Sequence, residues 1–189
     1  MTCGKIDFNC TRCRLSKGRT QVVSGNGPCD SRMFFIGEAP GKDEDLKGQP
    51  FVGRAGRVLD DAIEKAGARR DQVFVGNLVK CKPPNNRKPT RDEIETCSVF
   101  LESELRDVSP RVVCALGQTA ANHLLNTKDK ISNLAGREVP LTIAGKKVRL
   151  FVTFHPAACL YQRKNLAKFQ RDIRQCLKAA AVVKKGPKK

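Results

Sequence analysis

No stretch of this sequence is apolar for the roughly 20 residues that are needed to cross a bilayer. The N-terminal segment MTCGKIDFNC also lacks the apolar centre of a secretory signal. Both absences favour a soluble, intracellular protein.

Two phosphate-binding signatures are missing as well, G-x-x-x-x-G-K-[ST] and G-x-G-x-x-G. Their absence argues against a nucleotide-dependent enzyme, although the chain has several glycine turns. There is no internal repeat. Tryptophan is absent and there is a single tyrosine, so a phenylalanine in a glycine-bounded loop, Phe51 in GQPFVG, stands out.

Acidic residues are scarce relative to basic ones. The 36 Lys and Arg residues exceed the 19 Asp and Glu residues, which leaves a formal charge of +17. Such a balance favours an anionic partner, first nucleic acid and second an acidic membrane, although it is also compatible with solubility alone. A hydrophobic content of 40% supports a real core. We expect one domain over residues 1–183, with an N-terminal metal-binding segment and a basic tail, KKGPKK, at 184–189.

Apolar runs alternate with helical patterns along the chain. The predicted buried strands are RMFFIG (32–37), QVFVGNLVK (72–80), RVVCALG (111–117) and KKVRLFVTFHP (146–156), the last with a hairpin arm leading into it. The predicted helices cover residues 55–67, 89–105, 118–125 and 165–183, the second with Thr90 as N-cap and Glu93 completing a capping box. This alternation predicts an α/β fold in which helices cover both faces of a parallel sheet.

Three distinctive segments follow predicted strands: GEAPG, GN and HPAA. In open parallel sheets the ligand site lies at the carboxyl ends of the strands. One pocket is therefore expected to collect all three segments.

Nine cysteines are many for such a chain. Cys10 and Cys13 form a C-x-x-C pair, and Cys81 and Cys97 can approach each other from a strand end and the following helix. Four thiolates fit either structural zinc or an iron–sulfur cluster, and the spacing alone does not decide between them. The other five have no such pairing and are expected to be free thiols: Cys3, Cys29, Cys114, Cys159 and Cys176.

The ordered set of motifs resembles the family 4 uracil-DNA glycosylases, the iron–sulfur members of the uracil-DNA glycosylase superfamily. The matching segments cover nearly the whole chain: Cys10-x-x-Cys13, GEAPG with GQPFVGRAG, NLVKCKPPNNRKPT, Cys97 and HPAA. The resemblance implies a three-layer α/β/α sandwich with a central four-stranded parallel sheet. It also implies a [4Fe-4S] cluster held by Cys10, Cys13, Cys81 and Cys97, which orders a loop that faces DNA.

The same resemblance implies a DNA repair hydrolase that flips uracil out of DNA and leaves an abasic site, as in base excision repair. A side-chain amide matches the O4 acceptor and N3–H donor of uracil, and Asn77 occupies that position of the family motif. Phe51 would stack on the flipped base. Without the family, Asn77 would be interpreted as a capping residue and Phe51 as a core residue.

Two residues are expected to carry the chemistry. His155, in FHPAA, matches the family position that donates to uracil O2 as negative charge develops there. Glu38 would act on the sugar side, either on the attacking water or on the oxocarbenium-like sugar. Gly37, Ala39 and Gly41 would allow close backbone approach, and Asp43, Glu44 and Asp45 would order the loop that carries Phe51.

A further set of residues is expected to contact DNA, through phosphates or by wedging into the base stack. These are Arg87, Lys88, Arg91, Leu160, Tyr161, Arg163 and Lys164.

No lysine can be identified as a Schiff-base nucleophile, so strand cleavage is not expected. The segment NTKDKISNLAGREVP has no basic run with a histidine, which favours turnover over covalent trapping.

We expect a monomer in the prokaryotic cytoplasm, associated with the nucleoid. The resemblance is compatible with docking on a replication clamp, but no clear clamp-binding motif is present. The alternative hypothesis is a non-catalytic, metal-containing nucleic-acid-binding module. The combination of Glu38, Asn77 and His155 argues against it, because binding alone requires no such pocket.

Overall fold

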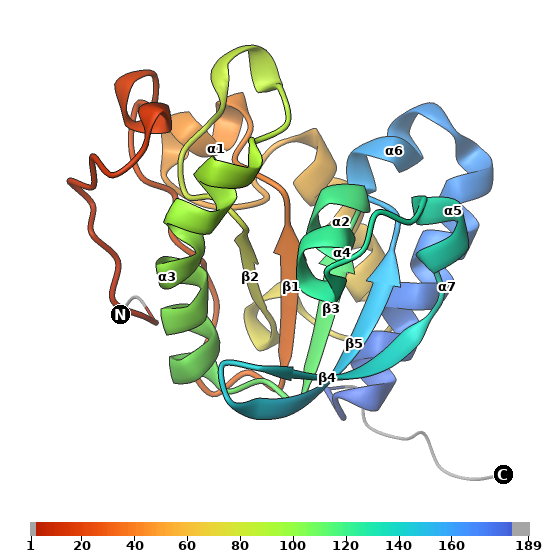
Figure 1. Cartoon of the computed structure of the whole chain (residues 1–189). Helices are drawn as coiled ribbons and strands as arrows, with labels where there is room; N and C mark the ends of the chain where they lie inside the picture. The colour runs from red at the N-terminus through yellow and green to blue at the C-terminus, as the bar shows by residue number, and fades with distance from the viewer. Residues whose placement is uncertain (1–2, 183–189) are drawn as a thin grey trace, which may run out of the picture.

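The computed structural model describes residues 3–182 and has a five-stranded sheet between two layers of helices (Figure 1). The strand order is β2-β1-β3-β5-β4, and the first four of these run parallel. The bounds are β1 Met33–Gly37, β2 Phe74–Asn77, β3 Val112–Leu116, β4 Glu138–Ile143 and β5 Lys146–Thr153. The predicted α/β/α sandwich with four parallel strands is thereby confirmed.

The fifth strand, β4, corrects the predicted strand count. It pairs antiparallel with β5 and forms the edge of the sheet. The sequence analysis predicted no separate strand over these residues, because β4 contains Pro140 and has no fully buried run. Proline is tolerated in a strand at a sheet edge, where one side of the backbone needs no partner.

Seven α-helices and three short 3-10 helices accompany the strands within the described residues. The α-helices are α1 Lys42–Lys47, α2 Arg54–Lys65, α3 Arg91–Val108, α4 Gln118–Leu125, α5 Ile131–Leu134, α6 Pro156–Tyr161 and α7 Arg163–Ala179. The 3-10 helices are η1 Arg14–Lys17, η2 Arg70–Gln72 and η3 Pro84–Asn86. Between residues 3 and 182, no helix has the length and apolar character of a membrane span. Val183, the predicted helix end, and the tail lie outside the described residues.

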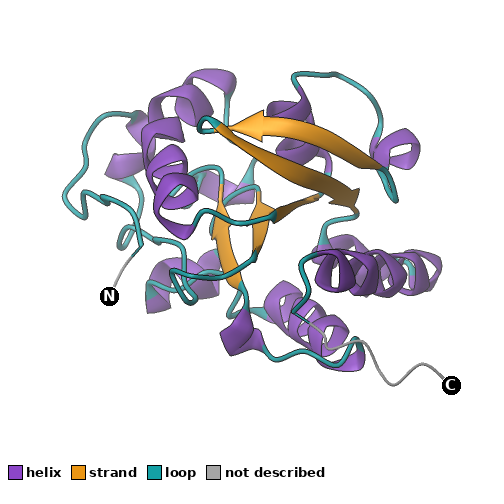
Figure 2. Cartoon of the chain, turned by 90° about the horizontal axis from the view of Figure 1, so that it is seen from below, coloured by secondary structure: helices purple, strands orange, loops and turns teal. Residues whose placement is uncertain are grey.

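Two separate cores lie on the two faces of the sheet, and Figure 2 shows helices on either side of it. Alternate residues of β1 point to opposite faces, as expected for a strand buried on both sides. Phe34 and Ile36 pack with α3 and α4, whereas Met33 and Phe35 pack with α2 and α7. This arrangement fixes the carboxyl ends of β1, β2, β3 and β5 along one edge.

The N-terminal segment runs along the outer edge of β2. Asn26 forms an antiparallel bridge with Val75, and the Val23 amide donates to the Lys80 carbonyl at 2.7 Å. These bonds cover strand edge that would otherwise expose unpaired backbone groups.

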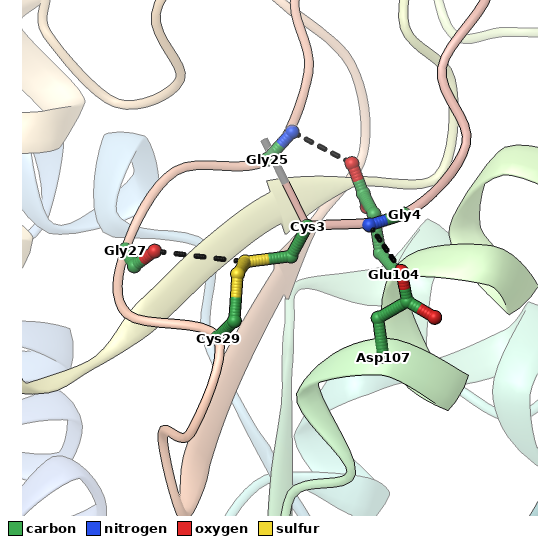
Figure 3. The surroundings of a disulfide bond; sticks show 7 residues. All are labelled: Cys3, Gly4, Gly25, Gly27, Cys29, Glu104 and Asp107. Carbon is green, nitrogen blue, oxygen red and sulfur yellow. Dashed lines mark hydrogen bonds between the residues drawn. A yellow bond between two sulfur atoms is a disulfide. The ribbon is translucent and has the colours of Figure 1, made fainter. Parts of the chain in front are cut away.

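A disulfide joins Cys3 to Cys29, with 5.5 Å between their Cα atoms (Figure 3). The expectation that these two cysteines are free thiols is therefore wrong. Sequence spacing does not define disulfide connectivity, and the pairing here depends on Gly4 and Gly25 being anchored to α3. The Gly4 amide donates to Asp107 and the Gly25 amide to Glu104 (Figure 3). The remaining seven cysteines are free.

Removing this disulfide is expected to lower the free energy of unfolding by about 3 kcal/mol, because the bond closes a long loop that contains Cys10 and Cys13. The test is urea denaturation of the oxidised protein and of the Cys3→Ser/Cys29→Ser variant. Added reductant should destabilise the parent protein and leave the variant unchanged. Equal stability of the two proteins under oxidising conditions would contradict the prediction.

Candidate active site

A cavity of about 350 Å³ lies at the carboxyl ends of the parallel strands. It collects the segments that follow β1, β2 and β5, as the sequence predicted. Its lining residues are Glu38, Ala39, Pro40, Gly41, Glu44, Phe51, Ala55, Asn77, Pro83, Asn86, Arg87, His155 and Ala157. The structure therefore brings every predicted base-contacting residue to this cavity, with Gly37 beside it.

Gly37 allows Phe51 and Asn77 to meet. A Cβ atom at Gly37 would lie 2.5 Å from the Asn77 Oδ1 and 2.6 Å from the Phe51 Cζ, which is closer than real contacts allow. The Phe51 ring and the Asn77 amide therefore converge over a position that only glycine can occupy. This gives the predicted close approach at Gly37 a specific steric reason.

Asn77 ends β2 and is 3% exposed. Among the described residues, its side-chain amide makes no hydrogen bond, whereas its backbone carbonyl accepts one from Lys80 Nζ at 3.0 Å. A nearly buried amide that faces a cavity without a protein partner has a donor and an acceptor available for a ligand.

Glu44 orders the loop that carries Phe51. Its carboxylate accepts hydrogen bonds from the backbone amides of Gly41, Val52 and Gly53 at 2.8–3.0 Å. Phe51 has a positive φ of 57°, an uncommon conformation for a residue with a side chain. The Glu44 contacts hold the two residues that follow Phe51, and thereby hold this conformation in place.

The other two acidic residues of α1, Asp43 and Asp45, differ in their surroundings. Asp45 is buried, and both of its carboxylate oxygens accept from the Thr20 amide at 3.0 Å. Asp43 is exposed. Glu44 and Asp45 thus order the loop as the sequence analysis expected, and Asp45 also attaches α1 to the N-terminal segment.

His155 is the N-cap of α6, and its ring centroid lies 6.2 Å from that of Phe51. Its Nδ1 accepts a hydrogen bond from the Ala157 amide at 3.2 Å. Burial lowers the pKa of His155 to about 4, so the imidazole is neutral at physiological pH. Because Nδ1 is an acceptor, the proton of the neutral ring is on Nε2, which can donate to a ligand.

Glu38 follows β1, is partly buried and lines the cavity. Its backbone carbonyl accepts from the Val79 amide at 3.4 Å. Within residues 3–182 its carboxylate makes no hydrogen bond, so it can interact with a ligand or a water molecule in the cavity.

The predicted DNA-contacting residues fall into two groups around the cavity. Arg87 binds Glu93 through both guanidinium ends at 2.7 and 2.8 Å, so much of its hydrogen-bonding capacity is used within the protein. Lys88 is exposed beside it, and Arg91 pairs with Glu95 on the surface. At the α6–α7 junction, Tyr161 is 79% and Leu160 37% exposed, followed by exposed Arg163 and Lys164.

Glu93 is a structural residue whose full role the sequence analysis missed. Its predicted capping contact is present, because it accepts from the Thr90 amide at 2.8 Å. It also binds Arg14 of the N-terminal segment at 2.8 Å. Hydrogen bonding from Arg87 is the main cause that lowers the pKa of Glu93 to about 2. One carboxylate therefore joins the cavity wall to the segment that carries Cys10 and Cys13.

The four predicted metal-binding cysteines line one second cavity. Cys10, Cys13, Cys81 and Cys97 surround it, together with Arg19, Lys80 and Phe100. Among residues 3–182, no group of three or more Cys, His, Asp or Glu side chains converges closely enough to hold a single metal ion. Four cysteine sulfurs around a shared space are a ligand set that fits either a structural zinc ion or an iron–sulfur cluster.

Two hydrogen bonds reach these sulfurs from neighbouring residues. Arg19 Nη1 lies 3.4 Å from the Cys81 Sγ and 2.6 Å from the Cys10 carbonyl, and the Lys80 amide lies 3.3 Å from the Cys97 Sγ. Donors to thiolate ligands of this kind orient them and stabilise their negative charge. Burial raises the pKa of Cys97 to about 11, so positive charge is needed to keep it as a thiolate.

A buried ion pair connects the two cavities. Lys80 Nζ lies 2.6 Å from the Glu104 carboxylate, and the two side chains are 1% and 0% exposed. Lys80 also donates to the Asn77 carbonyl, and Glu104 accepts from the Gly25 amide. The sequence analysis did not identify this pair, because a lysine between strand and helix has no distinctive local pattern.

The comparisons with known proteins agree with this geometry. The family model of the uracil DNA glycosylase superfamily matches residues 24–180, and the fold is of this class. Three relatives are type-4 uracil-DNA glycosylases. That of Archaeoglobus fulgidus is 40% identical over 172 residues, covering 89% of this chain and 86% of the relative. That of Thermotoga maritima is 45% identical over 157 residues, covering 82% and 80%. That of Pyrobaculum aerophilum is 40% identical over 169 residues, covering 87% and 86%.

The chain therefore belongs to the type-4 uracil-DNA glycosylase family of this superfamily.

Proposed function

We propose that this protein removes uracil from DNA by hydrolysing the bond between the base and its sugar, which leaves an abasic site. The observation that carries this proposal is the convergence of the free Asn77 amide, the Phe51 ring and the neutral His155 in one cavity. A base inside a duplex cannot reach such a cavity, so the nucleotide must be extruded. Phe51 provides a stacking surface, and the Asn77 amide complements uracil O4 and N3–H.

His155 acts on the base side of the glycosidic bond, and Glu38 acts on the sugar side. As the bond between the sugar C1′ and the uracil N1 breaks, its electron pair stays on the base, and His155 Nε2–H donates to the charge that develops at O2. Glu38 supplies negative charge beside the oxocarbenium-like sugar. A water molecule adds its oxygen to C1′, and the proton that it loses ends on solvent or on the uracil anion.

The supporting structure includes a proposed [4Fe-4S] cluster held by Cys10, Cys13, Cys81 and Cys97. When bound, the cluster supplies structural cross-linking between the N-terminal segment, the end of β2 and α3. Arg19 and the Lys80 amide would stabilise its thiolate ligands. The expected signature is visible absorption of the purified protein, with about four iron and four sulfide ions per chain. A colourless protein that contains one zinc ion would contradict this assignment.

The proposed DNA contacts lie at the rim of the cavity. We propose that the exposed side chains of Leu160 and Tyr161 wedge into the vacated base stack, while Arg163 and Lys164 contact phosphates. Arg87, which is bound to Glu93, shapes the cavity wall more than it binds phosphate. We further propose that the enzyme acts as a monomer in the cytoplasm.

The function is tested with matched oligonucleotides that contain uracil or thymine at one position. Uracil-dependent release of base should create sites that break only after alkali treatment, because no lysine of the cavity can cleave the strand. Breakage before alkali would contradict the monofunctional assignment. Binding of both oligonucleotides without any base release would instead support a non-catalytic nucleic-acid-binding module.

The buried His155 gives a pH prediction. Its pKa is lowered from about 6.5 to about 4, so the unfolded chain binds more protons than the folded protein between these values. Stability should therefore fall as pH decreases from 6.5 toward 4, and uracil excision should show no loss due to His155 until pH approaches 4. NMR titration can check this, since His123→Gln leaves His155 as the sole histidine. A midpoint near 6.5 for His155 would contradict the prediction.

A further inference from the structure

The outer face of α7 concentrates positive charge that extends well beyond the active-site edge. Its exposed or partly exposed cationic residues, in order along the helix, are Arg163, Lys164, Lys168, Arg171, Arg174 and Lys178. The inner face, with Phe169, Ile173, Cys176 and Leu177, is buried in the core. Figure 1 shows α7 beginning at α6, next to the active-site edge, and descending along the side of the molecule.

A single carboxylate on α7 offsets part of this charge. Asp172 is the helix's single acidic residue; it is 2% exposed and accepts from the Thr153 hydroxyl at 2.9 Å and from Arg171 at 3.2 Å. Near the far end of the helix, Glu138 is already paired with Arg149. Within the described part of the chain, Lys164, Arg174 and Lys178 form no salt bridge.

The neighbouring long helices have a different composition. On the same face of the sheet, α2 carries Asp60, Asp61 and Glu64 beside its basic residues. On the other face, α3 forms ion pairs along its length, including Arg91–Glu95 and Arg106–Glu102. The charge of the protein is therefore unevenly distributed, and a general excess of lysine and arginine does not explain the surface of α7.

This arrangement is unfavourable for an isolated helix. Lys164 and Lys168, and likewise Arg174 and Lys178, are like charges at i,i+4 spacing, which repel each other. Arg163 and Lys164 also lie in the first turn, at the positive end of the helix dipole, where no acidic residue offsets them. An anionic partner along the helix would relieve both repulsions.

The far end of α7 is too distant from the active-site edge to act on the DNA that is bound there. At 1.5 Å per residue, Arg174 and Lys178 lie about 16 and 22 Å along the helix from Arg163. These separations exceed the screening length of about 8 Å at physiological salt. The two cations therefore add little to the binding of DNA at the active-site edge, and any phosphates that they contact belong to another stretch of backbone.

We propose that the outer face of α7 binds the sugar–phosphate backbone of a DNA segment outside the one held at the active site. The partner assignment rests on the proposed function, which brings the protein onto DNA. A second, sequence-independent contact keeps the enzyme on DNA while the active site releases one position and reaches another. An acidic protein is the alternative partner, and the test below separates it from DNA.

The test uses the Arg174→Gln/Lys178→Gln variant, because both residues are exposed and remote from the cavity. The control variant is Lys65→Gln/Lys147→Gln, which removes the same charge from exposed positions on α2 and β5. Affinity for a long uracil-free duplex is measured against salt concentration. Loss of two phosphate contacts should reduce the slope of log K against log salt by about 1.8 in the α7 variant alone.

Two activity measurements complete the test. Excision from a short single-stranded oligonucleotide should equal that of the parent protein, whereas excision of two uracils in one encounter with a long duplex should fall several-fold. An unchanged salt slope, or an equal change in the control variant, would overturn the proposal, and an acidic protein partner would then be sought. Failure of the parent protein to release uracil would refute the proposed function, while the salt slopes would still decide the role of α7.

Discussion

Replacing Asn77 with alanine is expected to reduce uracil excision at least 100- to 1,000-fold while changing DNA affinity less than about threefold. The amide is 3% exposed, makes no side-chain hydrogen bond within the described residues and faces the cavity. A flipped uracil without this partner would leave its O4 and N3–H groups buried and unsatisfied. The phosphate contacts, which supply most of the affinity, lie elsewhere and should persist.

Single-turnover excision and binding to a uracil-free duplex measure the two effects separately. Asn77→Asp is the matched variant, because it preserves the size of the side chain and its acceptor oxygen and replaces the N–H donor with a negatively charged oxygen. It should lose excision of uracil nearly as completely as Asn77→Ala, with the same DNA affinity. If both variants lost activity and DNA affinity to the same extent, Asn77 would not be the residue that recognises the base.

Glu104→Ala is expected to lower the free energy of unfolding by about 3–5 kcal/mol. The substitution leaves the Lys80 ammonium group in a site where it is 1% exposed, and it removes the acceptor of the Gly25 amide. The damage should spread to both cavities, because Lys80 contacts the Asn77 carbonyl through its side chain and the Cys97 sulfur through its backbone. Urea denaturation followed by circular dichroism measures the loss.

A control on the same helix separates this effect from general loss of charge. Glu102 pairs with Arg106 at 3.8 Å, with both side chains more than half exposed, so Glu102→Ala should cost less than about 1 kcal/mol. The double variant Lys80→Met/Glu104→Leu removes both charges and should regain most of the stability lost in Glu104→Ala. Equal destabilisation by Glu104→Ala and Glu102→Ala would show that the buried pair has no special role.

The sequence predicted the parts of the fold that depend on local pattern. Runs such as MFFIG are buried on both faces, and their alternation with amphipathic helices defines a parallel sheet. The family resemblance is confirmed by the comparisons. β4 was missed because an edge strand with a proline and partly exposed residues has no such pattern.

The sequence predicted the residues of the candidate site but not the contacts that hold them in place. Position at a strand end was enough to place Asn77 and His155 in one cavity. The partners of Glu93, the Lys80–Glu104 pair and the Cys3–Cys29 disulfide join segments that are distant in the sequence. Their pairing depends on how the N-terminal segment packs against β2 and α3, which no local pattern encodes. The roles of the cavity residues remain predictions.

The backbone of Phe51 has a consequence for any effort to make this protein more stable. A residue with a side chain costs roughly 1–2 kcal/mol at a positive φ, and glycine would adopt the same conformation freely. The Phe51 side chain, however, is 7% exposed and packs in the core on the side of the sheet that α2 and α7 cover, where loss of a buried phenylalanine costs about 3–5 kcal/mol. Burial of the ring therefore outweighs the backbone cost, so resistance to heat and the stacking surface of the cavity both favour phenylalanine at this position.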